Sequence, residues 1–164
     1  MNESNLLFQV LCYEEGHIRR TQHILKVYAL VKMMGELEGL SLEQRQILQA
    51  ASILHDIGIK YCKENFDGDA SISRQKEVAC TLVSNFLLSS QYPRDYIPEI
   101  TKLVEEHHNY GSKNNTLLQI LIEADLLINY FEENTNLEYV NFMQSFFQTN
   151  TGKELLNKCL NYSN

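Results

Sequence analysis

Apolar residues recur with the spacing of an α-helix along most of the chain, and this pattern leaves little room for strands. Within residues 18–37, Val27, Leu30, Val31 and Met34 occupy positions i, i+3, i+4 and i+7 of one helix face. Only two prolines and seven glycines interrupt the chain. We find no convincing two-residue alternation and no hairpin turn signal. The sequence therefore predicts an all-α fold.

Capping boxes indicate where several of these helices begin. In a capping box, a Ser or Thr side chain accepts a backbone N–H, and a Glu or Gln three residues later reaches back. Ser41, Thr116, Thr135 and Thr151 each start such a motif. With the periodicity, they predict a compact bundle of about six to eight helices, near residues 18–38, 42–56, 73–89, 95–108, 117–133, 137–148 and 152–161, with a further short helix before residue 15.

Length and composition favour one domain. A chain of 164 residues suffices for one hydrophobic core, and no linker or internal repeat divides it. We expect a single domain over 1–164, with a core near 18–133 and C-terminal helices over 137–161. A hydrophobic content of 44% excludes intrinsic disorder. The net charge of −7 argues against a long nucleic acid or a membrane surface as the main partner.

Cysteine usage and the N-terminal residues both favour a soluble cytoplasmic protein. The four cysteines contain no Cys-x-x-Cys pair, so neither a zinc knuckle nor a disulfide framework is indicated. The first residues lack the positive charge with which a signal peptide starts. No apolar run approaches the roughly 18 residues of a membrane span.

The dipeptide His55-Asp56 lies at the end of an otherwise apolar helical segment. A buried imidazole and carboxylate need partners there, and a divalent metal would satisfy both. The alternative is a helix C-cap, with His55 favoured by the negative helix end and Gly58 in the left-handed conformation. The dipeptide alone leaves both interpretations open.

Two further polar residues interrupt apolar helix faces. His23 shares the buried face of its helix with Val27 and Leu30. Asp125 lies within residues 117–128, a segment that is apolar on almost every side. Either residue alone could be hydrogen-bonded in the core, but three helices that each carry a ligand-type residue favour a metal site. Two imidazoles and two carboxylates suit Mn²⁺, Fe²⁺, Co²⁺ or Zn²⁺.

The order His23, His55-Asp56 and Asp125 resembles the H…HD…D signature of the HD-domain metal-dependent phosphohydrolases. Residues 20–27 resemble the family's first-histidine helix, the HDIG sequence ends at Gly58, and residues 123–125 resemble its final-aspartate helix. The resemblance covers about residues 20–130. Residues 149–153 are similar to the C-terminal segment of short, single-domain clostridial-type members.

The resemblance implies a helical bundle with a metal in a cleft, and His23, His55, Asp56 and Asp125 as the ligands of one divalent ion (Mn, Fe, Co, Zn, Ni or Mg). It implies an enzyme that cleaves a phosphomonoester or phosphodiester, in a small phosphorylated substrate such as a nucleotide, with a metal-activated water oriented by Asp56 or a histidine. The alternative from another functional class is an HD module that binds metal or nucleotide without catalysis.

His107 and His108 fall on or beside the buried face at the end of their predicted helix. In related HD proteins, histidines at this position serve a second metal or act as acid and base. The alternative is a helix cap, where an imidazolium meets the negative helix end. HD proteins with two metals usually carry another histidine after the HD helix, but residues 71–77 contain none. This difference argues against a second metal.

Two cations lie close in sequence to the predicted ligands. Arg20 precedes His23 by three residues on the same helix face, and its guanidinium can hold a phosphate through two hydrogen bonds. Lys60 follows the HDIG turn. We predict both as substrate-binding residues, the alternative being solvated surface charges. His17 is out of phase with His23 and is expected at the surface.

Overall fold

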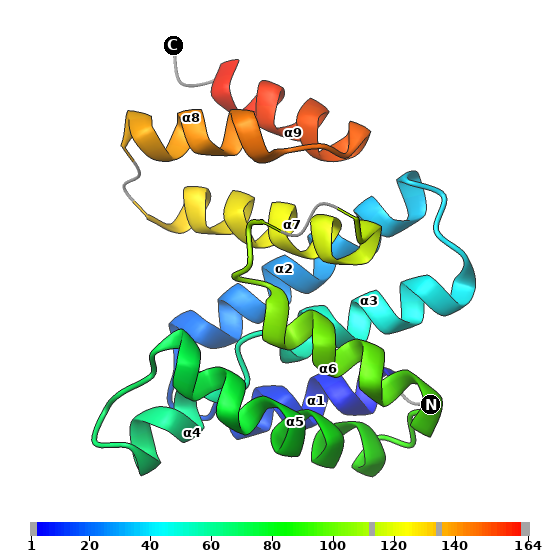
Figure 1. The fold of residues 1–164 in the computed structure, drawn as a ribbon, viewed down its shortest axis with the longest axis vertical. Coiled ribbons are helices and arrows are strands. Elements are labelled where there is room, and N and C mark those ends of the chain that lie inside the picture. The colour runs from blue at the N-terminus through cyan, green and yellow to red at the C-terminus, as the bar shows by residue number, and fades with distance from the viewer. Residues whose placement is uncertain (1–2, 112–113, 134–135, 162–164) are drawn as a thin grey trace.

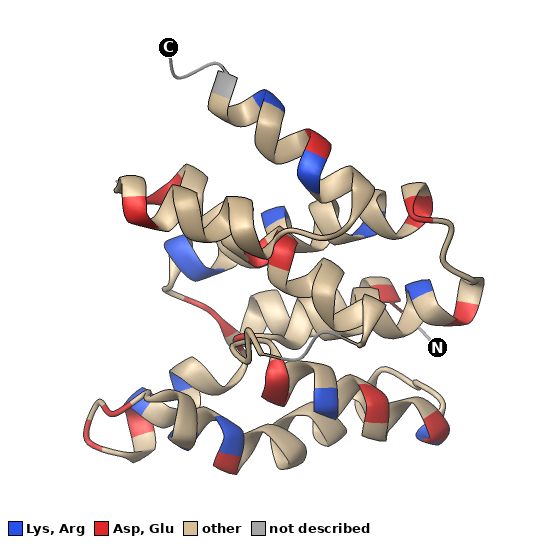
Figure 2. Ribbon diagram, turned by 45° about the horizontal axis from the view of Figure 1, so that its top comes forward, with Lys and Arg blue, Asp and Glu red and all other residues tan. Residues whose placement is uncertain are grey.

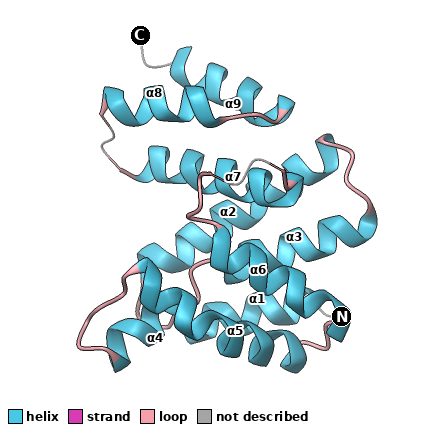
Figure 3. Ribbon diagram, in the orientation of Figure 1, coloured by secondary structure: helices cyan, strands magenta, loops and turns pink. Residues whose placement is uncertain are grey.

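A computed structural model describes residues 3–111, 114–133 and 136–161. These residues form helices and loops without a strand, which confirms the all-α prediction (Figures 1 and 3). Every predicted helix is present with ends within a few residues of the expected ones. The elements are α1 (Glu3–Tyr13), α2 (Ile18–Leu37), α3 (Leu42–Leu54), α4 (Gly58–Asn65), α5 (Ile72–Ser89), the 3₁₀ turn η1 (Arg94–Tyr96), α6 (Ile97–Glu106), α7 (Thr116–Glu132), α8 (Leu137–Phe146) and α9 (Asn150–Asn161).

Helix α7 runs through the middle of the molecule (Figure 1). All residues from Leu117 to Ile128 are buried, as expected for a helix that is apolar on nearly every side. Helix α2 packs against α3 and α7, α3 also packs against α6, and α5 packs against α4 and α6. The pair α8 and α9 lies on the far side of α7 from α4 and α5. The core therefore surrounds α7, which carries Asp125, and covers the face of α2 that carries His23.

The helix starts agree with the predicted capping boxes in one of the three places that can be compared. Ser41 forms a complete box with Gln44. Helix α7 is instead capped by Asn115, whose side chain accepts the Leu118 N–H, because Asn caps at least as well as Thr. The Gln119 side chain does not form the predicted box, and its amide Nε2 donates to Glu123, 2.8 Å away.

At α9, Thr149 rather than Thr151 accepts the N–H of Gly152, so this helix begins earlier than the box predicted. Thr135 lies outside the described residues, and Asn136 caps α8 by accepting the Tyr139 N–H.

The chain turns sharply after α3 and enters α4, a short helix that was not predicted. Gly58 is the first residue of α4, and it is not among the glycines with positive φ. The left-handed C-cap interpretation of Gly58 is therefore wrong. A Cβ at this position would lie 3.3 Å from the Cα of Gln75, so glycine allows α4 and α5 to approach closely. The close packing sets the direction of the turn that carries His55 and Asp56.

Charged residues of both signs are interleaved over the helices rather than gathered by sign (Figure 2). Among the described residues, no helix is both long and apolar enough to cross a membrane.

Candidate metal centre

Four elements bring their polar residues together beside α7. His23 comes from α2, the dipeptide His55-Asp56 from the turn after α3, and Asp125 from α7. The fourth element is the end of α6, which carries two histidines. The first and last of these residues, His23 and Asp125, thus meet although about a hundred residues separate them in the sequence. The residues that meet are His23, His55, Asp56, His107, His108 and Asp125.

Among the four predicted metal ligands, each of the two histidines has its Nε2 within 4 Å of both carboxylates. His23 Nε2 is 3.0 Å from Asp125 Oδ1 and 3.2 Å from His55 Nε2. Asp56 Oδ2 lies 3.5 Å from His55 Nε2 and 3.9 Å from His23 Nε2. Ligand atoms of His23, His55 and Asp56 form a group that could hold a metal ion. Two nitrogens and two carboxylate oxygens are a donor set for a borderline divalent metal.

Hydrogen bonds at the far side of each imidazole select the nitrogen that faces the cluster. His55 Nδ1–H donates to the Ser52 carbonyl oxygen at 2.8 Å, one turn back in α3. His23 Nδ1–H donates to Glu132 Oε2 at 3.0 Å. The Nε2 atom of each ring therefore points inward, as metal-ligating histidines require when the other nitrogen carries the proton.

His107 and His108 form a second group with Asp56. His107 is the C-cap residue of α6, and its Nδ1–H donates to the Val104 carbonyl oxygen at 2.6 Å, so the capping interpretation holds for this nitrogen. Its Nε2 is buried without a hydrogen-bond partner and lies 3.7 Å from Asp56 Oδ1. A buried nitrogen without a partner is the kind of atom that a metal ion would satisfy.

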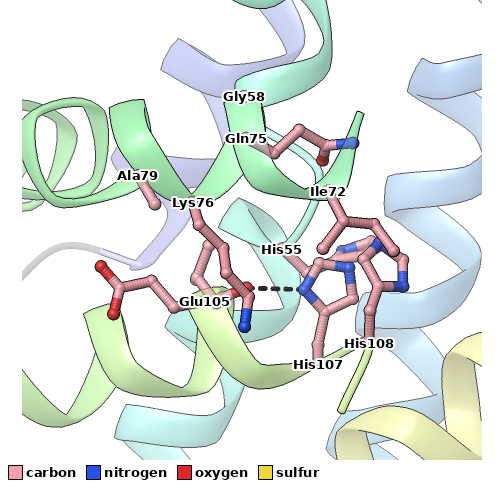
Figure 4. A pocket seen from close by; sticks show the side chains of 10 residues that line it. His55, Gly58, Ile72, Gln75, Lys76, Ala79, Glu105, His107 and His108 are labelled. Atoms are coloured by element: carbon pink, nitrogen blue, oxygen red, sulfur yellow. Dashed lines mark hydrogen bonds between the residues drawn. The ribbon is translucent and has the colours of Figure 1, made fainter. Parts of the chain in front are cut away.

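A small cavity beside the histidines is lined by residues of segment 71–77, the segment in which a further histidine would be expected for a second metal. Ile72 and Gln75, from the first turn of α5, line this cavity together with His107 and His108, and Figure 4 shows Ile72 beside His108. Neither side chain is a usual metal ligand, and Gln75 donates its amide Nε2 to the Ala70 carbonyl oxygen. The second group therefore has three protein ligands at most among the described residues.

The carboxylates that surround His23 keep it protonated in the absence of a metal. Burial opposes the charged imidazolium, but the hydrogen bond and charge of Asp125, the charge of Asp56 and the hydrogen bond of Glu132 outweigh it. They raise the pKa of His23 to about 9. Burial also opposes ionisation of Asp125, yet the hydrogen bond from His23 leaves its pKa below the ordinary value.

Two other histidines are held neutral. Burial lowers the pKa of His55, despite the nearby carboxylates. Burial, followed by the charge of His107, lowers the pKa of His108 to about 4. Both rings therefore carry a free lone pair at neutral pH, which suits either metal ligation or acceptance of a proton.

A cleft of about 630 Å³ opens over the cluster, within the range of small-molecule sites. His23, Asp56, His108 and Asp125 form part of its wall. Its other lining residues include His17, which is exposed, and the cations Arg19, Arg20 and Lys63. The ligand cluster is thus open to solvent through a pocket that also offers positive charge.

The two predicted substrate cations differ in their surroundings. Arg20 lines the cleft and is partly buried, and its Nε donates to the buried Glu14 at 2.7 Å. Lys60 is not among the lining residues of the cleft, because its Nζ donates to the Tyr13 carbonyl oxygen at 2.6 Å. Lys63, nearly one turn further along α4, faces the cleft instead.

A family model described as the HD domain matches residues 20–130. The chain belongs to the HD-domain superfamily of metal-dependent phosphohydrolases. Curated protein sequences gave no match to this chain, and neither did solved structures. The span matched by the HD-domain model begins at Arg20 and contains all six residues of the cluster. HD domains bind divalent metals, and the two His/Asp groups described above could hold one in this chain.

Sequence reasoning missed two acidic residues, Glu14 and Glu132, that pair with Arg20 and His23. Glu132 follows Asp125 by seven residues, or two helical turns, and this spacing was a usable signal that both face α2. Glu14 gave no such signal, since its pairing with Arg20 depends on how α1 meets α2. Lys63 is absent from the predicted substrate-binding residues, because α4 was not predicted.

Proposed function

We propose that this HD domain hydrolyses a phosphomonoester or phosphodiester bond in a small phosphorylated molecule, a nucleotide being the leading substrate class. The observation that carries the proposal is the cluster itself. The Nε2 atoms of His23 and His55 lie close to two carboxylates, and His23, Asp56 and Asp125 line a cleft that also contains cationic side chains. Metal ligands and phosphate-binding groups in one pocket are what a metal-dependent phosphohydrolase requires.

In this proposal His23, His55, Asp56 and Asp125 hold one divalent ion. Such an ion supplies a nucleophilic water at neutral pH and polarises a phosphoryl oxygen. Asp56 has one oxygen toward His23 and His55 and the other toward His107, so it can orient a water molecule between them.

His107 and His108 are proposed to act as general acid and base. His108 lines the cleft and is neutral at pH 7, since burial and His107 lower its pKa to about 4, so its ring can accept a proton. His107 can act only through Nε2, because its Nδ1–H is committed to the Val104 carbonyl.

Replacement of either histidine by Ala should lower kcat about 10²–10⁴-fold with the principal ion retained. Rates equal to the unmodified enzyme for both variants would contradict this role.

Arg20 and Lys63 are proposed to bind the phosphate, since both line the cleft. Glu14 holds the Arg20 guanidinium from behind through Nε, which fixes its direction. Lys60, the other predicted cation, is included in the same assay. Lys63→Ala should raise KM more than Lys60→Ala, because only the former removes a charge from the cleft wall.

The test of the proposed function is elemental analysis of the purified protein together with a phosphate-release screen. The screen covers mononucleotides, dinucleoside polyphosphates and cyclic dinucleotides with Mn²⁺, Fe²⁺, Co²⁺ or Mg²⁺. We expect about one ion per chain and cleavage of at least one substrate. Retention of metal and nucleotide without any cleavage would favour the non-catalytic binding module.

A further inference from the structure

Glu132 places a carboxylate on the side of His23 that faces away from the ligand cluster. Its Oε2 accepts the His23 Nδ1–H at 3.0 Å, and its Oε1 accepts from Lys26 Nζ at 2.8 Å. His23 and Lys26 are neighbours on one face of α2, so a single carboxylate bridges both. On its other nitrogen, His23 meets Asp125, two turns earlier in the same helix as Glu132. The imidazole is therefore held between two carboxylates of α7.

The position of Glu132 is unfavourable for an acidic residue. It is the last residue of α7, where the helix dipole opposes negative charge, and its side chain is only 9% exposed. Lys26 alone gives a weak reason for this placement, since Lys26 is 45% exposed and can be solvated. The neighbouring Glu133 lies in the ordinary arrangement, exposed and paired with the exposed Arg19. The specific contact of Glu132 is the one with the His23 ring.

We propose that Glu132 is a positioning residue, which fixes the orientation and tautomer of His23 so that its Nε2 serves the metal ion. This inference rests on the metal-binding part of the proposed function and does not depend on the substrate. A carboxylate behind a metal-ligating imidazole keeps the proton on the distal nitrogen and raises the basicity of the ligating one. His55 needs no such residue, because the Ser52 carbonyl performs the same task from within its own helix.

The experiment compares Glu132→Ala and Glu132→Gln with two controls. Glu133→Gln makes a similar charge change one residue further along, without a histidine contact. Lys26→Met breaks the other contact of Glu132 and leaves the His23 contact in place. The dissociation constants of Zn²⁺ and Co²⁺ are measured by competition with a chromophoric chelator. The melting temperatures of the metal-free proteins and the absorption spectra of the Co²⁺ forms are recorded as well.

We expect Glu132→Ala to weaken Zn²⁺ binding about 10–100-fold and to change the Co²⁺ spectrum. Glu132→Gln should recover part of the affinity, since its amide oxygen can still accept the Nδ1–H. Both controls should bind Zn²⁺ as the unmodified protein does. A lower metal-free melting temperature with unchanged affinity and spectrum would mean a structural role and would overturn the inference. So would equal losses in Glu132→Ala and Lys26→Met.

The outcomes separate this inference from the proposed function. If the unmodified protein binds neither ion, the metal-binding part of the proposed function fails and the role of Glu132 fails with it. If the unmodified protein binds Zn²⁺ and Glu132→Ala binds it equally well, only the positioning role is wrong.

Discussion

Two buried carboxylates on α7, Glu123 and Asp125, lie two residues apart and accept hydrogen bonds from different kinds of donor. Glu123 is fully buried and faces the connection between α8 and α9. It accepts from the Gln119 amide, from the backbone N–H groups of Gln148 and Thr149, and from the Thr149 hydroxyl. Asp125 faces the opposite side, and its hydrogen-bond donors are the imidazole of His23 and the amide of Asn129.

The difference lies in the kind of donor. Amide and hydroxyl donors keep their protons near neutral pH, so the site of Glu123 is closed, and this carboxylate joins the C-terminal helices to the core. The principal donor to Asp125 is an imidazole that can lose its proton and present a lone pair, so an ion can replace the proton. From the chemistry of their donors, we therefore propose that Glu123 serves stability and Asp125 serves metal binding.

The largest expected effect is the loss of the metal in Asp125→Ala. This change removes one of the four predicted ligands, whereas the control His17→Ala alters an exposed residue of the cleft. We expect no metal above background in Asp125→Ala by elemental analysis after dialysis, and an unchanged metal content in His17→Ala. Undiminished metal in Asp125→Ala would count against the site.

Glu123→Ala should have the opposite profile. It leaves at least three buried donors without an acceptor, and each costs about 1–3 kcal/mol, so we expect a loss of roughly 3 kcal/mol or more in the free energy of unfolding. Zn²⁺ affinity of the remaining folded protein should stay within about twofold of the unmodified protein, because the ligand cluster is on the other face. Urea unfolding and a metal titration together test this. A variant as stable as the unmodified protein would contradict the structural role.

Gly152→Ala tests the same structural carboxylate with a single added methyl group. A Cβ at Gly152 would collide with Glu123 Oε2 and lie 2.7 Å from Thr149 Oγ1. We expect a loss of about 1–3 kcal/mol, as for overpacking elsewhere in cores. Gly111→Ala is a suitable control, since its nearest neighbour would be 3.4 Å away. Equal melting temperatures for the two variants would show that the connection adapts without cost.

The smallest effect is a dependence of metal affinity on pH. The metal-free fold gains stability from charged His23 below pH 6.5, and this gain is lost as pH rises through its pKa of about 9. A divalent ion must displace that proton at neutral pH. Affinity should therefore rise with pH up to about 9, by at most about tenfold per pH unit for one proton. Calorimetry in buffers of different ionisation enthalpy measures the proton released, and a value of zero would refute this coupling.

The sequence alone singled out several of the polar residues that the fold brings together at the site. A polar residue on an apolar helix face is visible in the periodicity, and this singled out His23 and Asp125 before any contact was known. The prediction that they coordinate an ion, with His55 and Asp56, remains for the metal analysis to test. The spacing of apolar residues likewise located seven helices of the bundle to within a few residues.

Local sequence patterns determined which segments are helical, because the periodicity and the capping residues act within one or two turns. The tertiary structure decided what those patterns do not contain. Helix α4 begins at Gly58, which packs closely against Gln75 of α5, and Lys60 donates to the carbonyl of Tyr13 in α1. The partners Glu14 and Glu132 became identifiable only once α1 and α7 were placed against α2. Hydrogen bonds and ion pairs act over about 3–4 Å, and only the packing of helices brings distant residues within that range.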